Sequence, residues 1–319
     1  MRRRAFLALG LGLLPLSAGC GTNRPRTGPP ISLVVPTQAG AQGGPFAREL
    51  KTLIERQRLA GKVEIRTRSG DAGARALARF AAGRDYDDLM VAGPALVAIA
   101  ARNGLGGLIE RTSPLARFAG EWVVLVTGPH SRFRTFDDLA AALIRDPSRL
   151  RLAGRDTGGP DHVLYGLTAQ GLGIHPRSLN YVALPDLSQV LAATLDGSAV
   201  AGLGGRRELA ADIRAGRVRP LAVSSLERLD GVDAPTLKES GVRLHYAHWT
   251  GLLGPGRLGG QERERLLDLC RAVSDLPGWA EVCRGNGWAP MFLDGDDFRQ
   301  WLGTEARRTK VVLGELGLL

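Results

Sequence analysis

Three short, glycine-rich segments have the composition of a site that binds anions through main-chain N–H groups. They are Thr37–Gly44, Gly93–Ala95 and Arg155–Asp161, and each precedes the start of a helical pattern. The free N–H groups of a helix N-terminus carry a partial positive charge and can bind a carboxylate. Placed across a cleft, the first and third segments could hold the two ends of a small carboxylated solute. The alternative is that they are ordinary βα turns that use glycine for backbone reasons.

Side chains near these loops add further candidates. His162 lies close to the start of its helix, where it could bind ligand or make a structural hydrogen bond to a neighbouring loop. Arg206 and Arg207 open another helix; they could pair with carboxylates, although solvated arginines are the simpler interpretation. The candidates from the loops themselves are Thr37, Gln38, Gln42, Gly43, Gly93, Pro94, Thr157, Gly158 and Gly159.

Signatures of nucleotide binding and of hydrolysis are missing. The segment Gln38–Gly44 is neither a Walker loop nor a G-x-G-x-x-G fingerprint, and the chain has no G-x-S-x-G elbow. His245 and His248 are three residues apart, so on a strand they would point to opposite faces and would not easily chelate one metal ion. We therefore expect no metal, no cofactor and no catalytic residues.

The N-terminus has the features of an export signal. Arg2–Arg4 form a positive segment, Ala5–Leu16 is apolar, and small residues lead to Cys20. The apolar run is shorter than the roughly 20 residues of a transmembrane helix. A cysteine here resembles a lipoprotein signal, and the paired arginines resemble a twin-arginine signal. We expect a signal peptide over 1–19 and a lipid-anchored linker over 20–30, on the outer face of the cytoplasmic membrane, in the periplasm or at the cell surface.

The charge of the chain is moderately basic. The formal net charge is +10, and removal of Arg2, Arg3 and Arg4 with the signal leaves +7. Arginines are spread along the chain without a basic block or an aromatic stacking motif, so we expect no nucleic-acid partner. A receptor for anionic solutes fits this balance better.

Cys270 and Cys283 are the two cysteines that remain beside Cys20. An even pair in a disulfide-permissive compartment could form a bond between neighbouring helices. The alternative is two buried thiols. A metal site is not expected, since no histidine or third cysteine has ligand spacing nearby.

Strand and helix patterns alternate along the chain. Strands are expected at 31–36, 63–67, 88–92, 122–127, 150–153, 180–184, 199–203, 218–224 and 249–253. Helices are expected at 45–59, 71–82, 95–102, 136–144, 161–170, 187–195, 206–215, 261–274, 277–284 and 296–316. Such alternation predicts parallel sheets covered by helices, and the number of strands favours two α/β lobes.

Four segments resemble a known family. Leu152–His162 (LAGRDTGGPDH) is similar to the glycine-rich segment of the Bug-type periplasmic solute-binding proteins, the substrate-binding components of tripartite tricarboxylate transporters. Ile213–Arg228, Asp233–Gly241 and Trp249–Pro255 resemble the family's "AGKLRALAVTS…R", "DVPTVAEAG" and lobe-re-entry segments. The order and spacing agree from about Ile31 to the C-terminus.

The resemblance implies a type II periplasmic-binding-protein-like α/β fold with two lobes. Each lobe is expected to be a mainly parallel sheet flanked by helices, with the ligand cleft between them. Lobe 1 would comprise 31–125 and 249–319, and lobe 2 would comprise 126–248. The implied function is a monomeric receptor that captures a small carboxylate and delivers it to membrane transporter subunits, without chemistry on the ligand.

The sequence departs from the family at the expected site. Gly43, Gly44 and Pro45 stand where a glycine run followed by Thr-Asp-Thr is usual, and Gly159 replaces a threonine. Gly204, a further candidate for the ligand site, stands where an aspartate is common. A main-chain clamp could survive these changes, but ligand discrimination by side chains must differ, and a divergent or larger ligand would fit.

Two rival functions stay open at the level of the sequence. One is a ligand sensor for a membrane signalling partner, which the sequence does not separate from a transport receptor. The other is an exported enzyme on the same architecture, which would need a nucleophile and a base in the cleft.

Overall fold

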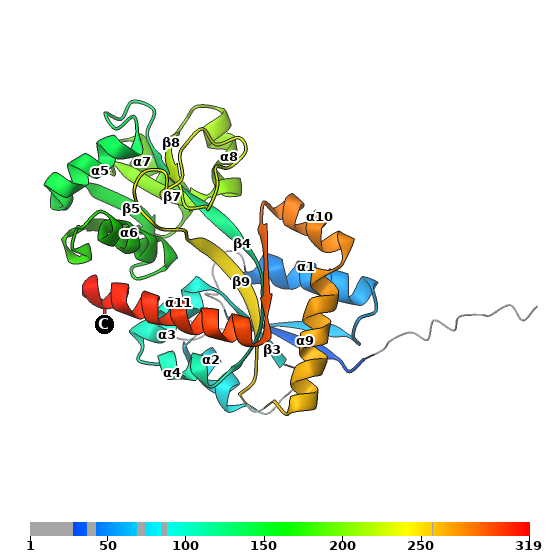
Figure 1. The fold of residues 1–319 in the computed structure, drawn as a ribbon. Coiled ribbons are helices and arrows are strands. Elements are labelled where there is room, and N and C mark those ends of the chain that lie inside the picture. The colour runs from blue at the N-terminus through cyan, green and yellow to red at the C-terminus, as the bar shows by residue number, and fades with distance from the viewer. Residues whose placement is uncertain (1–27, 37–42, 69–73, 84–87, 257) are drawn as a thin grey trace, which may run out of the picture.

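The computed structural model of the protein describes residues 28–36, 43–68, 74–83, 88–256 and 258–319. Figure 1 shows two α/β units, one above the other, with two long strands running between them. These strands are β4 (Ser113–Thr127) and β9 (Ala247–Gly254). The two-unit α/β architecture predicted from the alternating sequence pattern is confirmed.

The first unit contains the N-terminal elements and most of the C-terminal ones. Its strands, apart from β4 and β9, are β1 (Ile31–Pro36), β2 (Val63–Arg68), β3 (Asp88–Ala92) and β10 (Ala289–Asp294). Its helices are α1 (Gly43–Arg56), α2 (Ala74–Ala82), α3 (Pro94–Arg102), α4 (Gly106–Glu110), α9 (Gly260–Ser274) and α10 (Pro277–Asn286). β1 is fully buried and pairs in parallel with both β2 and β3.

The second unit is formed by the middle of the chain. Its strands, beside the end of β4, are β5 (Arg151–Arg155), β6 (Asn180–Leu184), β7 (Ala201–Gly205) and β8 (Arg219–Val223). Its helices are α5 (Phe136–Arg145), α6 (Pro160–Gly171), α7 (Leu187–Leu195) and α8 (Arg206–Arg214), with 3₁₀ turns at Pro147–Arg149 and Pro176–Ser178. β5 pairs in parallel with β6 and β7.

The direction of β4 determines how the two units face each other. Its first part pairs antiparallel with β9, and its last part pairs antiparallel with β7 and β8. β3 is also antiparallel to β9, so β1, β2 and β3 run in the same sense as β4, toward the second unit. β5, β6 and β7 run back toward the first unit. The carboxyl ends of both sets of parallel strands therefore meet where β4 passes from one unit to the other, near Glu121.

Each unit has its own hydrophobic core. In the first unit, Phe46, Phe118, Trp279 and Trp288 form an aromatic cluster, and the rings of Phe46 and Phe118 are 5.6 Å apart between centroids. In the second unit, buried residues of α5 and α6 pack on the β4–β7–β5 sheet. Aromatic side chains bury large areas, so a few of them contribute much of the stability of a core.

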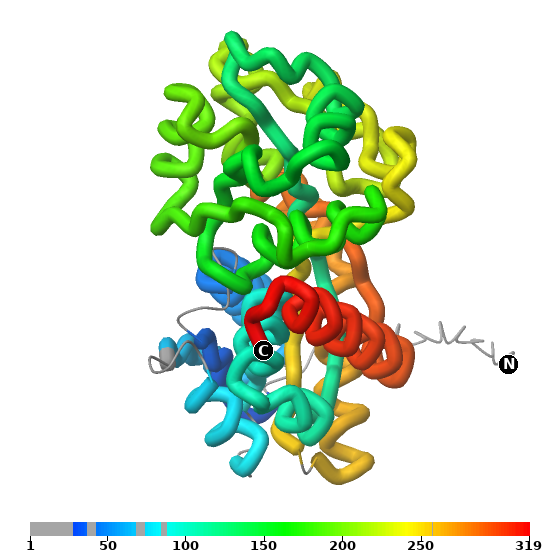
Figure 2. Tube along the Cα trace, turned by 90° about the vertical axis from the view of Figure 1, so that its left-hand side faces the viewer, coloured from blue at the N-terminus to red at the C-terminus, as the bar shows by residue number. Residues whose placement is uncertain are grey.

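The C-terminal helix α11 (Gly295–Glu315) packs against both cores. Phe298 and Leu302 lie in a cluster of the first unit with Trp249, whereas Val312 and Leu313 are buried in the core of the second. Figure 2 shows this helix, in red, at the boundary of the two units. An ideal Cβ on Gly166 would lie 2.6 Å from Val312 Cγ2, so the glycine in α6 allows α11 to approach closely.

The structure adds strands that the hydrophobic pattern did not predict. β4 starts at Ser113, nine residues before the predicted strand at 122–127, and β10 is absent from the expected elements. Arg117 and Gly120 interrupt the apolar pattern in this part of β4, which is extended because it pairs with β9 on one side and β10 on the other. These pairings are long-range, and local propensity does not report them.

The two core cysteines do not form a disulfide. Cys270 of α9 and Cys283 of α10 are free thiols, buried in the core of the first unit. Packing among apolar side chains explains their presence, which corrects the disulfide hypothesis in favour of two buried thiols. Among the described residues, no helix combines the length and the apolar character needed to cross a membrane.

Candidate ligand-binding site

The junction of the two sheets brings together several of the predicted loop residues. Gly93, at the end of β3, caps α3, with Pro94 in the first helical turn. Thr157–Gly159 connect β5 to α6, and Gly204 lies at the carboxyl end of β7. In open α/β sheets ligands bind beyond the carboxyl ends of the strands, so this junction is the candidate site.

Four residues of the sequence-based expectation lie outside the described residues. Thr37, Gln38 and Gln42 belong to the segment between β1 and α1, and Cys20 precedes the described part of the chain. Gly43, the first residue of α1, is buried.

The β5–α6 loop adopts a conformation that requires glycine. Gly158 has φ +70°, in the left-handed region, and Asp156, two residues earlier, also has a positive φ of 47°. The N–H of Gly159 donates to the carbonyl of Asp156 over 2.9 Å, which closes the turn. Gly159 then caps α6 without a side chain, and Pro160 fills the first helical position.

The side chain of His162 holds this loop through a hydrogen bond. Its Nδ1 accepts a hydrogen bond from the Gly158 N–H over 3.1 Å, and its ring stacks on Tyr181 with centroids 3.8 Å apart. Burial, and then the charge of Arg102, lower the pKa of His162 to about 4. The ring is therefore neutral at physiological pH, and the structural hydrogen bond considered for this histidine is present.

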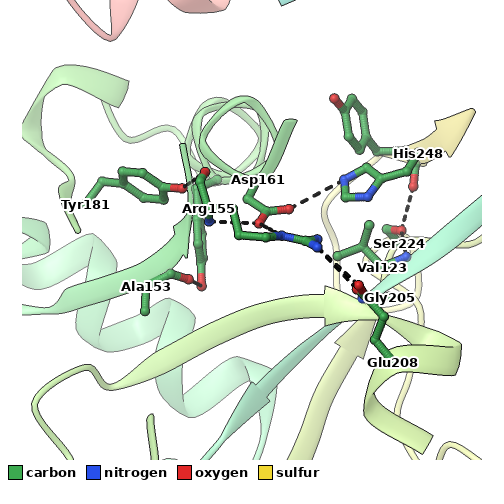
Figure 3. Close-up of polar contacts among 11 residues, drawn as sticks. Val123, Ala153, Arg155, Asp161, Tyr181, Gly205, Glu208, Ser224 and His248 are labelled. Atoms are coloured by element: carbon green, nitrogen blue, oxygen red, sulfur yellow. Dashed lines mark hydrogen bonds and ion pairs between the residues drawn. The ribbon is translucent and has the colours of Figure 1, made fainter. Parts of the chain in front are cut away.

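Arg155 is the centre of a buried ionic network beneath the loop. Its Nε donates to Asp161 Oδ2 over 3.0 Å, and its Nη1 donates to Glu208 Oε1 over 3.2 Å, as Figure 3 shows. Its carbonyl accepts from the Tyr181 hydroxyl over 2.6 Å. Burial disfavours the charged guanidinium, but the attraction of Asp161 and Glu208 outweighs it and raises the pKa of Arg155. The network fixes the end of β5 to the starts of α6 and α8.

Asp161 also faces the interunit strand β9. His248 Nε2 lies 3.5 Å from Asp161 Oδ1, and within the described part of the chain neither buried atom has a hydrogen-bond partner. Burial lowers the pKa of His248, with an opposing effect from Asp161, so this histidine is neutral near pH 7. Through this pair, the first turn of α6 contacts β9.

Glu121 of β4 lies at the N-terminus of α8. It is 2 % exposed, and its Oε1 accepts from the Arg207 N–H over 3.1 Å. An ideal Cβ on Gly205 would overlap the Glu121 carboxylate, so glycine is required there. Burial, and then repulsion by Glu208, raise the pKa of Glu121 to about 7, although the Arg207 N–H acts in the opposite direction.

The two arginines that open α8 are bonded to the protein. Arg206 Nη2 donates to the carbonyl of Asp230 over 2.8 Å. Arg207 Nη1 donates to Asn286 Oδ1 of α10 over 3.2 Å, which links the two units. Both arginine side chains therefore have hydrogen-bond partners in the protein, whereas the sequence alone favoured solvated side chains.

Sequence reasoning missed the charged residues of the junction. Arg155 joins Asp161 and Glu208 there, Glu121 accepts a hydrogen bond from the N-terminus of α8, and Arg102 of α3 lies against Gly158. One signal was available, because Glu121 directly precedes an apolar strand run and charged residues are seldom buried without a partner. Among the residues that the structure describes, no three His, Cys, Asp or Glu side chains gather as a metal site would require.

Comparisons with known proteins agree with the architecture. The model for the tripartite tricarboxylate transporter family receptor matches residues 100–318, and no curated protein matches the chain. A TctC solute binding protein from Polaromonas, solved without ligand, is similar at 18 % identity and TM-score 0.76, over 90 % of this chain and 99 % of that one.

Two similar structures contain ligands. MatC from Rhodopseudomonas palustris, with bound malate, has 19 % identity and TM-score 0.68, over 89 % of this chain and 99 % of its own. Another R. palustris protein, with adipate, has 20 % identity and TM-score 0.70, over 91 % of this chain and 97 % of its own. At these identities the likeness shows the fold.

Proposed function

This chain belongs to the tripartite tricarboxylate transporter receptor family, and we propose that it captures a small carboxylated compound between two lobes and delivers it to a membrane transporter. As a receptor of this family it works outside the cytoplasm. The observation that carries the proposal is the meeting of the β3, β5 and β7 carboxyl ends at one junction, with the glycine-rich start of α6 beside them. Relatives with bound malate and adipate support a carboxylate ligand.

The two lobes are assigned to the two units. Lobe 1 comprises 31–125 and 249–319, and lobe 2 comprises 126–248. β4 and β9 act as the hinge, because β4 pairs with strands of both sheets and β9 leads the chain back from the second unit into the sheet of the first. Ligand contacts that exist only when the lobes are close would favour the closed state.

The ligand carboxylate is assigned to the β5–α6 loop. Main-chain N–H groups in the first turn of α6 can bind an anion. The missing side chain of Gly158 leaves the space that Arg102 occupies, so a cationic side chain lies beside this helix start. The proposed ligand-binding residues are Thr37, Gln38, Gln42, Gly43, Gly93, Pro94, Thr157, Gly158, Gly159, His162 and Gly204. The receptor carries out no reaction on its ligand, and no cofactor is needed for such a role.

The N-terminal segment is assigned to export and anchoring. Residues 1–19 serve as a signal peptide, and Cys20 carries a lipid that holds a monomeric receptor at the outer face of the cytoplasmic membrane. Residues 21–30 act as a tether whose length sets how far the receptor reaches toward transporter subunits.

A thermal-shift screen against small carboxylates tests the proposed function. A ligand present far above its dissociation constant stabilises the native state by a few kcal/mol. At least one carboxylate should raise the melting temperature in a concentration-dependent manner. If no carboxylate does so while a neutral or a purely cationic solute does, the proposed substrate class is wrong.

A further inference from the structure

A second hollow of the molecule, the arginine cleft, lies in the second unit. Its volume is about 710 Å³, within the range of about 300–1,000 Å³ that is usual for binding pockets. Its walls come from the segment before α5, the end of α8, the start of β8 and the loop after β8, all in the upper unit of Figure 1. The charged lining residues are Arg134, Arg214, Arg219 and Asp233, and Ile213 and Pro220 supply apolar surface.

The register of β8 on β4 places the arginine cleft far from the junction of the two units. Arg219 pairs with Thr127, the last residue of β4, whereas Glu121 at the junction comes six residues earlier in that strand. At about 3.3 Å per residue, this separation corresponds to about 20 Å. α8 likewise begins beside Glu121 and ends at Arg214. The arginine cleft is therefore separate from the proposed carboxylate site.

Positive charge is in excess in the arginine cleft. Three of its lining residues are arginines, and one, Asp233, is an acid. Arg134 and Arg214 are exposed, and neither forms an ion pair within the part of the chain that the structure describes. Two guanidinium groups are therefore available to an anionic partner.

Acids close to these arginines in the sequence are engaged elsewhere. Asp138 caps α5, where its Oδ2 accepts the main-chain N–H groups of Arg134 and Thr135. Asp212 of α8 pairs with Arg217, whose Nε lies 2.7 Å from its Oδ1. The positive charge of Arg214 thus has no partner on its own helix turn, although that of Arg217 does.

Hydrogen bonds to main-chain carbonyls fix two walls of the arginine cleft. The Nη2 of Arg219 donates to the Pro129 carbonyl over 2.8 Å, and its Nη1 lies 3.5 Å from the Phe133 carbonyl. On the other side, Arg206 donates to the Asp230 carbonyl over 2.8 Å, directly before the lining residues of the loop after β8. Groups that are already fixed lose less conformational freedom when a partner binds.

We propose that the arginine cleft is a docking site for an acidic segment of the membrane transporter subunits. The inference rests on the proposed function, in which the receptor delivers its ligand to such subunits. Clusters of arginines recognise acidic segments through charge-assisted, often bidentate hydrogen bonds. Apolar side chains of the same segment would pack on Ile213 and Pro220. A bilayer presents its charges in a plane and would not enter a cleft, and a single small anion would fill only part of it, so charge and shape together favour a protein segment.

The test measures binding of acidic peptides to the full mature chain. The probes are fluorescein-labelled heptapeptides that contain three glutamates at different spacings among apolar residues, each with a counterpart in which glutamine replaces glutamate. Binding is followed by fluorescence anisotropy at low salt, where exposed charges are least screened. At least one acidic peptide should bind at least about tenfold more tightly than its counterpart. If no acidic peptide does so, the inference is overturned.

The double variant Arg134→Gln/Arg214→Gln removes the two unpaired charges of the arginine cleft. Both positions are exposed, so the melting temperature should not change. The affinity for the acidic peptide should fall at least about tenfold. The control, Arg145→Gln/Arg243→Gln, removes two exposed charges elsewhere in the same unit and should leave the affinity unchanged. Equal losses in the two double variants would show attraction by net charge alone and would overturn the inference.

Other occupants of the arginine cleft are separated by two further probes. Vesicles of phosphatidylglycerol and phosphatidylcholine, and inorganic phosphate, are offered to the parent and to Arg134→Gln/Arg214→Gln. If either probe binds in a manner that depends on these arginines while no acidic peptide binds, the occupant is a lipid or a free anion, and the inference is wrong.

The thermal shift caused by small carboxylates distinguishes this inference from the proposed function. That shift should be the same in the parent and in Arg134→Gln/Arg214→Gln, because the carboxylate site is assigned to the junction. Its loss in the variant would contradict the separation of the two sites. Failure of every carboxylate on the parent contradicts the proposed function, whereas failure of the acidic peptides alone contradicts only the docking site.

Discussion

The guanidinium of Arg102 donates to the main-chain carbonyl of Thr157 over 2.6 Å, and this hydrogen bond joins α3 of the first unit to the β5–α6 loop of the second. The same side chain covers Gly158, whose missing Cβ leaves space for it. Because α3 and the loop approach the junction from opposite units, the contact depends on how close the units are. If the units move relative to each other, as the proposed function requires, this contact would couple that motion to the geometry of the β5–α6 loop.

Replacement of Arg102 by alanine should weaken ligand binding more than it weakens the fold. Arg102 is exposed, so its loss should lower the free energy of unfolding by less than about 1 kcal/mol. Loss of its positive charge and of the contact with Thr157 should reduce carboxylate affinity about tenfold, measured by calorimetry. Arg145→Ala, which changes the last residue of α5 in the same way, is the control. Equal affinities for the two variants would contradict this role for Arg102.

Gly158→Ala should abolish the ligand-induced thermal shift. The left-handed conformation disfavours alanine by about 1–2 kcal/mol, and the new Cβ would collide with Arg102. Gly173→Ala is a matched control, because Gly173 has φ +73° but no heavy atom lies within 4 Å of its ideal Cβ position. Both variants should lose similar stability, and only Gly158→Ala should lose binding. Retention of the full shift would contradict the placement of the carboxylate.

Asp161→Asn should destabilise the protein far more than Glu208→Gln. Asp161 is 1 % exposed and accepts from both the N–H and the Nε of Arg155, so neutralising it leaves a buried guanidinium poorly compensated. The cost should be about 2–4 kcal/mol. Glu208 holds the same arginine from a partly exposed position, and its loss should cost less than about 1 kcal/mol. Denaturant unfolding measures the free energy of unfolding of both variants. Equal losses would show that the burial of Asp161 does not determine the cost of neutralising it.

The raised pKa of Glu121 predicts a stability change with pH. The group ionises at about 7 in the folded protein and ordinarily at 4.5, so the folded state holds more protons between these values. The contribution of Glu121 to the free energy of unfolding therefore falls by about 3 kcal/mol as the pH rises from 4.5 to 7. Above pH 7 this contribution no longer changes. Glu121→Gln should be more stable than the parent at pH 8 and nearly equal at pH 4.5. A stability difference that does not vary with pH would contradict the assigned pKa.

Cys270 and Cys283 should resist alkylation in the native protein. Burial raises the pKa of Cys270 to about 12 and that of Cys283 to about 11, so neither thiolate forms at pH 8. Iodoacetamide should label both only after denaturation, as peptide mapping of an unreduced sample would show. Recovery of a peptide with Cys270 bonded to Cys283 would instead restore the disulfide hypothesis.

Local sequence patterns were sufficient for the architecture and for the position of the main loop. Short β-branched runs alternating with helical spacing predicted α/β units, and the glycines of Arg155–Asp161 marked a turn before a helix. Gly158 and Gly159 do occupy that turn, with the positive φ at Gly158 that only glycine adopts readily. Information of this kind is local, because propensity and periodicity are properties of neighbouring residues.

The charged interior of the junction was decided by the tertiary structure. Glu121 and Arg207 are 86 positions apart in the chain, and they meet because β4 pairs antiparallel with β7, which ends at Gly205 directly before α8. The link between α3 and Thr157 likewise depends on two units folding against each other. The sequence by itself predicted most of the helices and strands and the glycine turn between β5 and α6. Which side chains face that turn, and with what charge, followed only from long-range strand pairing, since the energy of a buried carboxylate depends on neighbours that local sequence does not reveal.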